Sequence, residues 1–195
     1  MSWLSDLWKG PPANYARRPL TISPALIPAG AIILTSTSTR NLISWLIREV
    51  TRARVSHSIL YTGGPRLGTI EAEMAGVKED SIKSWLNDKT TMAWVWVYTR
   101  EGGLRDDQRT KIVSYARGCL GKSYDISEFL GFALGDPEGC AGQEICSRLT
   151  TEAYLEPAIQ TSAKSPAETA PGDQMRWFQE HPDEWTLIAV QNVKP

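Results

Sequence analysis

Cysteine and histidine are scarce in this chain, which has three cysteines and two histidines among its 195 residues. The cysteines form no Cys-x-x-Cys pair and have no histidine at the spacing of zinc ligands, so we expect neither a disulfide framework nor a structural zinc site. An excess of either charge is also lacking, with 21 basic against 22 acidic residues. We therefore expect no nucleic-acid partner, and nothing in the composition calls for a metal or a cofactor.

Long apolar runs are missing as well. The first nine residues, Met-Ser-Trp-Leu-Ser-Asp-Leu-Trp-Lys, lack the basic start and apolar stretch of a secretory signal, and no later stretch reaches membrane-spanning length. The sequence thus predicts a chain that is synthesised in the cytoplasm without a signal peptide and that has no transmembrane segment.

The residues that are present predict a folded protein. Hydrophobic residues make up 42% and charged residues 22% of the chain, which is ordinary for a globular protein. At 195 residues the chain is long enough to form one compact core. Five prolines between Gly10 and Gly30 indicate an extended lead-in. We therefore expect an N-terminal extension over residues 1–27 and a single domain over residues 28–195.

Hydrophobic periodicity predicts an alternation of strands and helices along this domain. Strands are expected over residues 31–35, 55–61, 69–73, 93–98 and 185–190. Helices are expected over residues 40–54, 82–86, 105–117, 126–134 and 144–155, and residues 160–173 are expected to form a surface loop.

The pattern that carries chemistry combines a cysteine, a histidine and a carboxylate. Cys146 falls in the first turn of a predicted helix, where free N–H groups favour the thiolate. His57 lies on a strand that fixes its direction, whereas His181 lies in a turn-like His-Pro-Asp-Glu stretch, so His57 is the better base. Glu71 and Glu73 share one face of the next strand, and either could orient the imidazole.

Four stretches occur in an order that resembles a known superfamily: Val55-Ser-His-Ser-Ile-Leu-Tyr-Thr-Gly63, Ile70-Glu-Ala with Gly76-Val77 following, Gly121-Lys-Ser-Tyr-Asp125, and Ile145-Cys-Ser147. Together they resemble the circularly permuted NlpC/p60 proteins, including the YiiX/YebB-like group, which are similar to lecithin:retinol acyltransferase-type enzymes. In that superfamily the histidine strand precedes the cysteine helix. The resemblance covers residues 28–190, although Ala31 stands where the superfamily usually has Asp.

The resemblance implies an α+β fold of the permuted papain-like type, in which an antiparallel sheet packs against helices and the catalytic cysteine begins a helix. It implies Cys146 as nucleophile, His57 as base and Glu71 as the residue that orients the imidazole, with Glu73 as the second candidate. Tyr124 matches a family tyrosine whose hydroxyl could stabilise an oxyanion, but it can equally be an ordinary buried tyrosine. Cys119 and Cys140 are expected to be structural or incidental.

Three functions remain open at this point. The first is a cysteine peptidase or amidase that cleaves peptide or amide bonds of bacterial peptidoglycan, delivered as an antibacterial effector by type VI secretion or by phage to the periplasm of a target cell, with an immunity or delivery protein as partner. The second is an acyltransferase, thioesterase or phospholipase that acts on acyl lipids. The third is a non-catalytic binding module of the same fold.

Overall fold

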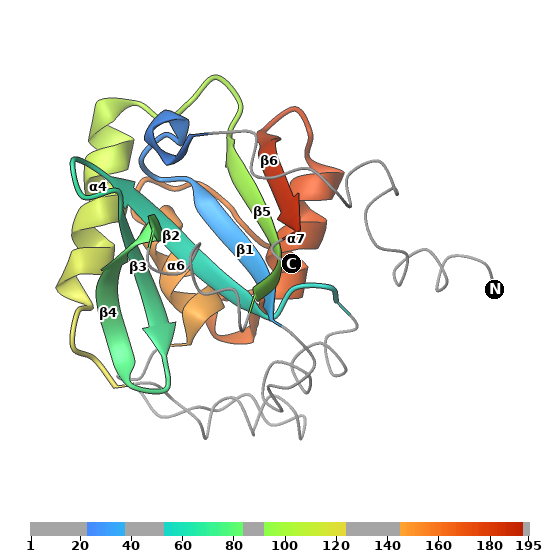
Figure 1. Ribbon diagram of the computed structural model, residues 1–195. Coiled ribbons are helices and arrows are strands. Elements are labelled where there is room, and N and C mark those ends of the chain that lie inside the picture. The colour runs from blue at the N-terminus through green and yellow to red at the C-terminus, as the bar shows by residue number, and fades with distance from the viewer. Residues whose placement is uncertain (1–22, 38–52, 84–91, 124–144, 193–195) are drawn as a thin grey trace.

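The computed structural model describes residues 23–37, 53–83, 92–123 and 145–192 (Figure 1). Over these ranges the chain forms six strands, three α-helices and two short 3-10 turns, η1 (Pro24–Leu26) and η2 (Pro166–Glu168). In chain order the longer elements are β1 (Ile32–Thr37), β2 (His57–Gly63), β3 (Gly68–Glu73), β4 (Gly76–Ser81), β5 (Met92–Arg100), α4 (Asp106–Gly118), α6 (Cys146–Leu155), α7 (Pro171–Glu180) and β6 (Trp185–Asn192).

The strands form one antiparallel sheet in the order β4-β3-β2-β1-β5-β6. The register pairs Thr35 of β1 with His57 of β2 and pairs Glu71 of β3 with Lys78 of β4. The predicted α+β class and antiparallel sheet are therefore confirmed for the described residues, and the predicted strands over residues 55–61 and 69–73 are neighbours as expected.

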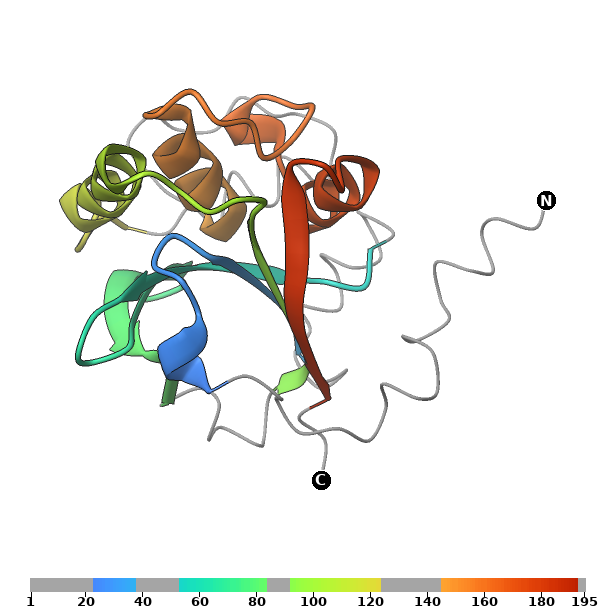
Figure 2. The same cartoon turned by 90° about the horizontal axis from the view of Figure 1, so that it is seen from above.

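The three helices cover one face of the sheet (Figure 2). Apolar side chains of α4, α6 and α7 pack there against those of the strands, and the buried cluster includes Leu34, Leu60, Ile112, Leu149 and Phe178. Side chains from alternate strand positions, among them Ile33, Ile59, Tyr61, Val95 and Val97, form a second buried cluster on the opposite face. Both faces of the central strands are thus buried, which explains their continuous apolar sequences.

Two elements differ from the sequence-based expectation. Residues 160–173 were expected to be a surface loop, but Thr161, Ser162 and Thr169 are buried and α7 begins at Pro171. Proline fits the first turn of a helix because the N–H that it lacks would have no helical acceptor, and the Asp173 carboxylate accepts the Ala170 N–H at 3.0 Å. Proline at this position therefore starts α7, whereas the composition had indicated a loop.

The second difference is β4, which the sequence analysis did not predict. Its residues, Gly-Val-Lys-Glu-Asp-Ser, carry little hydrophobic signal because β4 is the edge strand of the sheet. At its start, Gly76 has φ +107, and a Cβ there would meet the Lys122 carbonyl oxygen at 2.7 Å. Glycine is therefore needed at this position, where the β3–β4 turn meets the segment that follows α4. The next residue also contacts that segment, because the Val77 N–H donates to the Lys122 carbonyl oxygen at 2.9 Å.

The other predicted elements divide into two groups. The predicted strands near residues 31–35, 93–98 and 185–190 and helices near 105–117 and 144–155 correspond to β1, β5, β6, α4 and α6. The helix predicted over 126–134 and most of those over 40–54 and 82–86 lie outside the described residues, as does most of the N-terminal extension. Within the described ranges, no helix has the length and apolar character needed to cross a membrane.

Candidate active site

Cys146 is the first residue of α6 and so lies in the first turn of the helix, as the sequence predicted. The residue before it, Ile145, is extended and caps the helix without a side-chain hydrogen bond, so backbone N–H groups of the first turn remain available at this end. Cys146 is buried and forms no disulfide. A thiol at this position receives the positive partial charge of the helix N-terminus, which favours its anion.

His57 begins β2 and bonds directly to Glu71 on the neighbouring strand. The distance from His57 Nε2 to Glu71 Oε2 is 2.7 Å. The Glu71 side chain is only 4% exposed, whereas that of His57 is 18% exposed. Because Nε2 is engaged by the carboxylate, Nδ1 is the ring nitrogen that remains for the Cys146 thiol.

The charges of these groups depend on one another. Burial by itself would lower the pKa of His57, but the Cys146 thiolate, followed by Glu71, outweighs burial and raises that pKa well above its ordinary value. Burial would likewise raise the pKa of Cys146, but the charge and hydrogen bond of His57, followed by the backbone N–H groups of Ser58 and Ser147, lower it. The two shifts favour a thiolate–imidazolium pair.

Glu73 was the second candidate for orienting the imidazole, and its carboxylate makes a different contact. Glu73 Oε2 lies 2.7 Å from the ammonium of Lys78, which is also 4.0 Å from Glu71 Oε1. Although burial would raise the pKa of Glu71, the hydrogen bond and charge of His57 and then the charge of Lys78 lower it. The structure thus brings Glu71 to His57 as an anion and brings Glu73 to Lys78.

A buried polar network joins α6 to the histidine strand and to α7. The hydroxyl oxygens of Ser58 and Thr150 lie 3.0 Å apart, and the Gln174 amide donates to Thr150 Oγ1 at 2.9 Å and to Thr151 Oγ1 at 3.0 Å. The Ser147 hydroxyl donates to the Thr169 carbonyl at 2.6 Å. Because Ser58 directly follows His57 in β2, this network fixes α6 relative to the strand that carries His57.

The remaining predicted residues lie elsewhere. Cys119 caps the C-terminal end of α4 within the apolar cluster under the helices. His181 follows α7, where its ring stacks on Trp177 with 3.7 Å between centroids. Tyr124 and Cys140 lie outside the described residues. Lys78 was not among the predicted residues, because residues 76–81 are too polar to be recognised from sequence as a strand paired with residues 68–73.

Donor atoms of His57, Glu71 and Glu73 lie within 4.8 Å of one another, which is close enough to consider a metal ion. The ammonium of Lys78, however, is 2.7 Å from Glu73 and 4.0 Å from Glu71, while the other oxygen of Glu71 is bonded to His57. A divalent ion bound by these residues would therefore be repelled by the positive charge of Lys78, which lies against the same carboxylates. With Lys78 in place, these three residues do not fit a metal.

Comparison with known proteins agrees with the fold. No protein-family model matches the chain, and no curated protein matches it. Among solved structures it is similar to the metalloprotein YiiX of Escherichia coli O157:H7, with 20% identity, a TM-score of 0.52, and coverage of 85% of this chain and 88% of YiiX. The likeness is consistent with the resemblance to YiiX/YebB-like proteins found in the sequence. The chain thus shares its fold with YiiX.

Proposed function

We propose that the protein is a cysteine hydrolase in which Cys146 is the nucleophile, His57 the base and Glu71 the residue that orients the imidazole. The observation that carries this proposal is the hydrogen bond between His57 and the buried Glu71, 2.7 Å between Nε2 and Oε2, beside a thiol whose pKa is lowered at the start of a helix. A thiolate is the reactive form of cysteine, and an adjacent imidazolium both stabilises it and holds a proton for the leaving group.

The reaction follows from this arrangement. The thiol proton moves to His57 Nδ1, and the sulfur attacks the carbonyl carbon of an amide or ester. N–H groups of the first turn of α6, which have no helical acceptor, stabilise the oxyanion of the tetrahedral intermediate. His57 then gives its proton to the leaving amine or alcohol, and an acyl-enzyme forms. Water attacks this thioester with His57 as base, and the acid and the free thiol are released.

The chain order of the site supports the permuted NlpC/p60 arrangement. The histidine strand β2 and the carboxylate strand β3 come before the cysteine helix α6. On that likeness we propose peptide or amide bonds of bacterial peptidoglycan as the substrate, reached through delivery as an antibacterial effector.

The neighbour YiiX is described as a metalloprotein, and a metal could take part in hydrolysis by polarising a carbonyl or activating water. In this chain the three donor residues face the ammonium of Lys78 at 2.7 Å and 4.0 Å. The proposed mechanism therefore passes through the thiol of Cys146 and through no metal.

A substrate panel tests the proposal. Purified muropeptides and acyl lipids are incubated separately with the protein, and the products are identified by mass spectrometry. We expect cleavage of an amide bond in the muropeptides and loss of about 10³-fold or more of the rate in Cys146→Ala, because the proposed nucleophile is gone.

The matched control is Cys119→Ala, which removes the other described cysteine and should retain most of the activity. If only fatty acid is released, the substrate is a lipid and not peptidoglycan, with the same residues proposed to catalyse the reaction. Full activity in Cys146→Ala, with either substrate, would contradict the proposed chemistry.

A further inference from the structure

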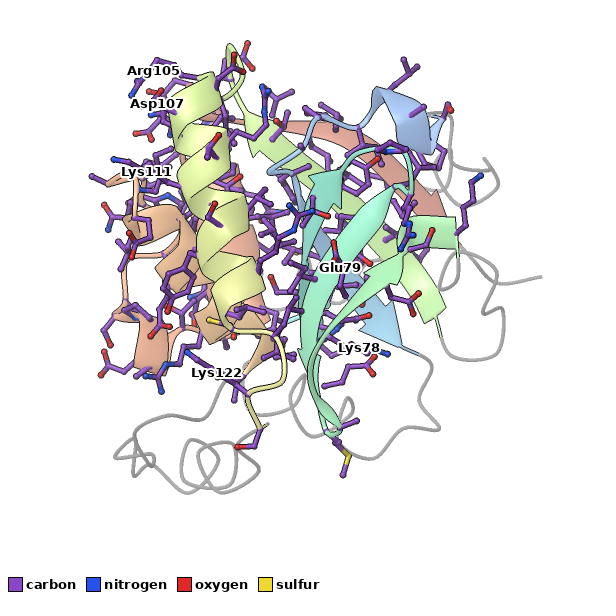
Figure 3. All side chains as sticks on the ribbon, turned by 90° about the vertical axis from the view of Figure 1, so that its left-hand side faces the viewer. Lys78, Glu79, Arg105, Asp107, Lys111 and Lys122 are labelled. Carbon is purple, nitrogen blue, oxygen red and sulfur yellow. The ribbon has the colours of Figure 1, made fainter. Side chains whose placement is uncertain are left out.

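Lys78 lies beside the proposed base and its carboxylate, on the edge strand β4. It is the direct cross-strand partner of Glu71, so their side chains lie on the same face of the sheet. Figure 3 shows Lys78 on the side turned away from α4, whereas Glu79, the next residue, forms an ion pair with Arg117 of that helix. The face that carries Glu71 therefore also carries a cation.

The two carboxylates on this face each contact a positive group. Glu71 uses Oε2 for His57, at 2.7 Å, and turns Oε1 toward Lys78, at 4.0 Å. Glu73 uses Oε2 for the same ammonium, at 2.7 Å. The ammonium thus stands between the carboxylates, at the place where a bound cation would balance their charge.

The three donor groups are of the kind that divalent metals bind. One imidazole and two carboxylates suit manganese and similar ions, and their donor atoms lie within 4.8 Å of one another. A metal held by His57 and Glu71 would remove the imidazole from proton transfer. The same residues can therefore either bind a metal or act as a base, His57, hydrogen-bonded to Glu71. Which of the two applies depends on whether a positive charge already lies between the carboxylates.

We propose that Lys78 is a built-in cation that excludes divalent metals from His57, Glu71 and Glu73, leaving His57 and Glu71 bonded to each other. The importance of this exclusion for catalysis rests on the proposed function, but the exclusion itself does not. Lys78 and Glu73 are each 43% exposed, and an exposed ion pair of this kind adds little to stability. The charge of Lys78 is thus expected to act on the site and not on the fold.

The test measures manganese binding to the full chain. Lys78→Met and Lys78→Gln remove the positive charge, and Lys78→Arg keeps it. All variants carry Cys146→Ala, so that the thiolate does not contribute a ligand and hydrolase activity does not enter the result. Each is titrated with Mn²⁺ and followed by the electron paramagnetic resonance signal of the free ion, while thermal melting shows that the variants remain folded.

We expect Mn²⁺ to bind about tenfold or more tightly in Lys78→Met and Lys78→Gln than in the Lys78 parent, since a like charge next to the ligands has been removed. Lys78→Arg should bind as weakly as the parent. Adding Glu73→Gln to Lys78→Met should remove the gain, which assigns it to this site. Equal affinity in the parent and Lys78→Met, whether both bind tightly or neither binds, would overturn the proposal.

Discussion

The two described cysteines, Cys146 and Cys119, are both buried and outside any disulfide, yet they occupy opposite helix ends. Cys146 begins α6 and interacts with the imidazole of His57. Cys119 caps the C-terminal end of α4 inside an apolar cluster. A helix N-terminus favours an anion and a C-terminus opposes one. Burial alone therefore does not distinguish a structural thiol from a reactive one, whereas the helix end and the neighbouring charge do.

Among the groups around Cys146, the imidazole of His57 should affect the hydrolysis rate most when it is removed. In His57→Ala we expect the rate of substrate hydrolysis to fall roughly 10²–10⁴-fold, because both the base and the counter-ion of the thiolate are lost. The measurement is the initial rate on the substrate that the panel identifies. His181→Ala is the matched control, since that ring stacks on Trp177 beyond the end of α7 and should leave the rate nearly unchanged. Equal losses in both variants would contradict the assignment of the base.

Substitution of the two glutamates should change the hydrolysis rate by factors that differ less than those of the two histidines. Glu71→Gln keeps the size of the side chain but removes the charge that faces His57, and we expect a loss of roughly tenfold or more in rate. Glu73→Gln should lower the rate less than about threefold, because its carboxylate contacts Lys78 at 2.7 Å and not the imidazole. The comparison uses the same rate assay. A larger loss in Glu73→Gln than in Glu71→Gln would exchange their proposed roles.

The smallest effect on catalysis is expected from the buried polar network that joins α6 to β2 and α7. Its contribution is measured as a change in the stability of the fold. Thr150→Val removes a buried hydroxyl that contacts both Ser58 and Gln174. Two buried polar groups lose a partner, so the free energy of unfolding should fall by about 1–3 kcal/mol. Denaturant unfolding measures the change.

Thr110→Val on the exposed face of α4 is the control and should change the free energy of unfolding by less than about 0.5 kcal/mol. If the two substitutions cost the same, the contacts that fix α6 against β2 are less important than their burial indicates.

Sequence patterns predicted the elements that carry the proposed catalytic residues. The alternation before Tyr61 and after Gly68 predicted β2 and β3, and the helical spacing that ends before Pro157 predicted α6. Each of these elements contains enough buried apolar residues for its pattern to be recognised in the sequence. The antiparallel neighbours β2 and β3 then follow from the short turn between them.

The features that the sequence did not predict depend on which strands pair, or on residues that are compatible with more than one kind of local structure. Periodicity places Glu71 and Glu73 on one face and cannot choose between them, whereas the register of β3 against β4 brings Lys78 to both carboxylates. The strand β4 itself is polar because it lies at the sheet edge. The start of α7 at Pro171 was expected to belong to a loop because residues 160–173 are rich in Ser, Thr, Ala and Pro, and proline can begin a helix as well as end one.

The central claim is that Cys146 is ionised by its surroundings, and the pH dependence of its alkylation tests this claim most directly. The lowered pKa of Cys146 means that the thiolate persists as the pH falls below the range of an ordinary thiol. Iodoacetamide, chosen because it is small and the residue is buried, is reacted with the protein at a series of pH values. Labelled sites are quantified by peptide mass spectrometry.

From about pH 8.5 to about pH 6 the labelling rate of an ordinary thiol falls roughly a hundredfold, since its pKa is near 8.5. We predict that the rate at Cys146 falls by a much smaller factor over the same interval, because its pKa is lowered, and that His57→Ala restores the steep dependence. A hundredfold fall at Cys146 in the unaltered protein, parallel to that of a cysteine-containing peptide, would contradict the account.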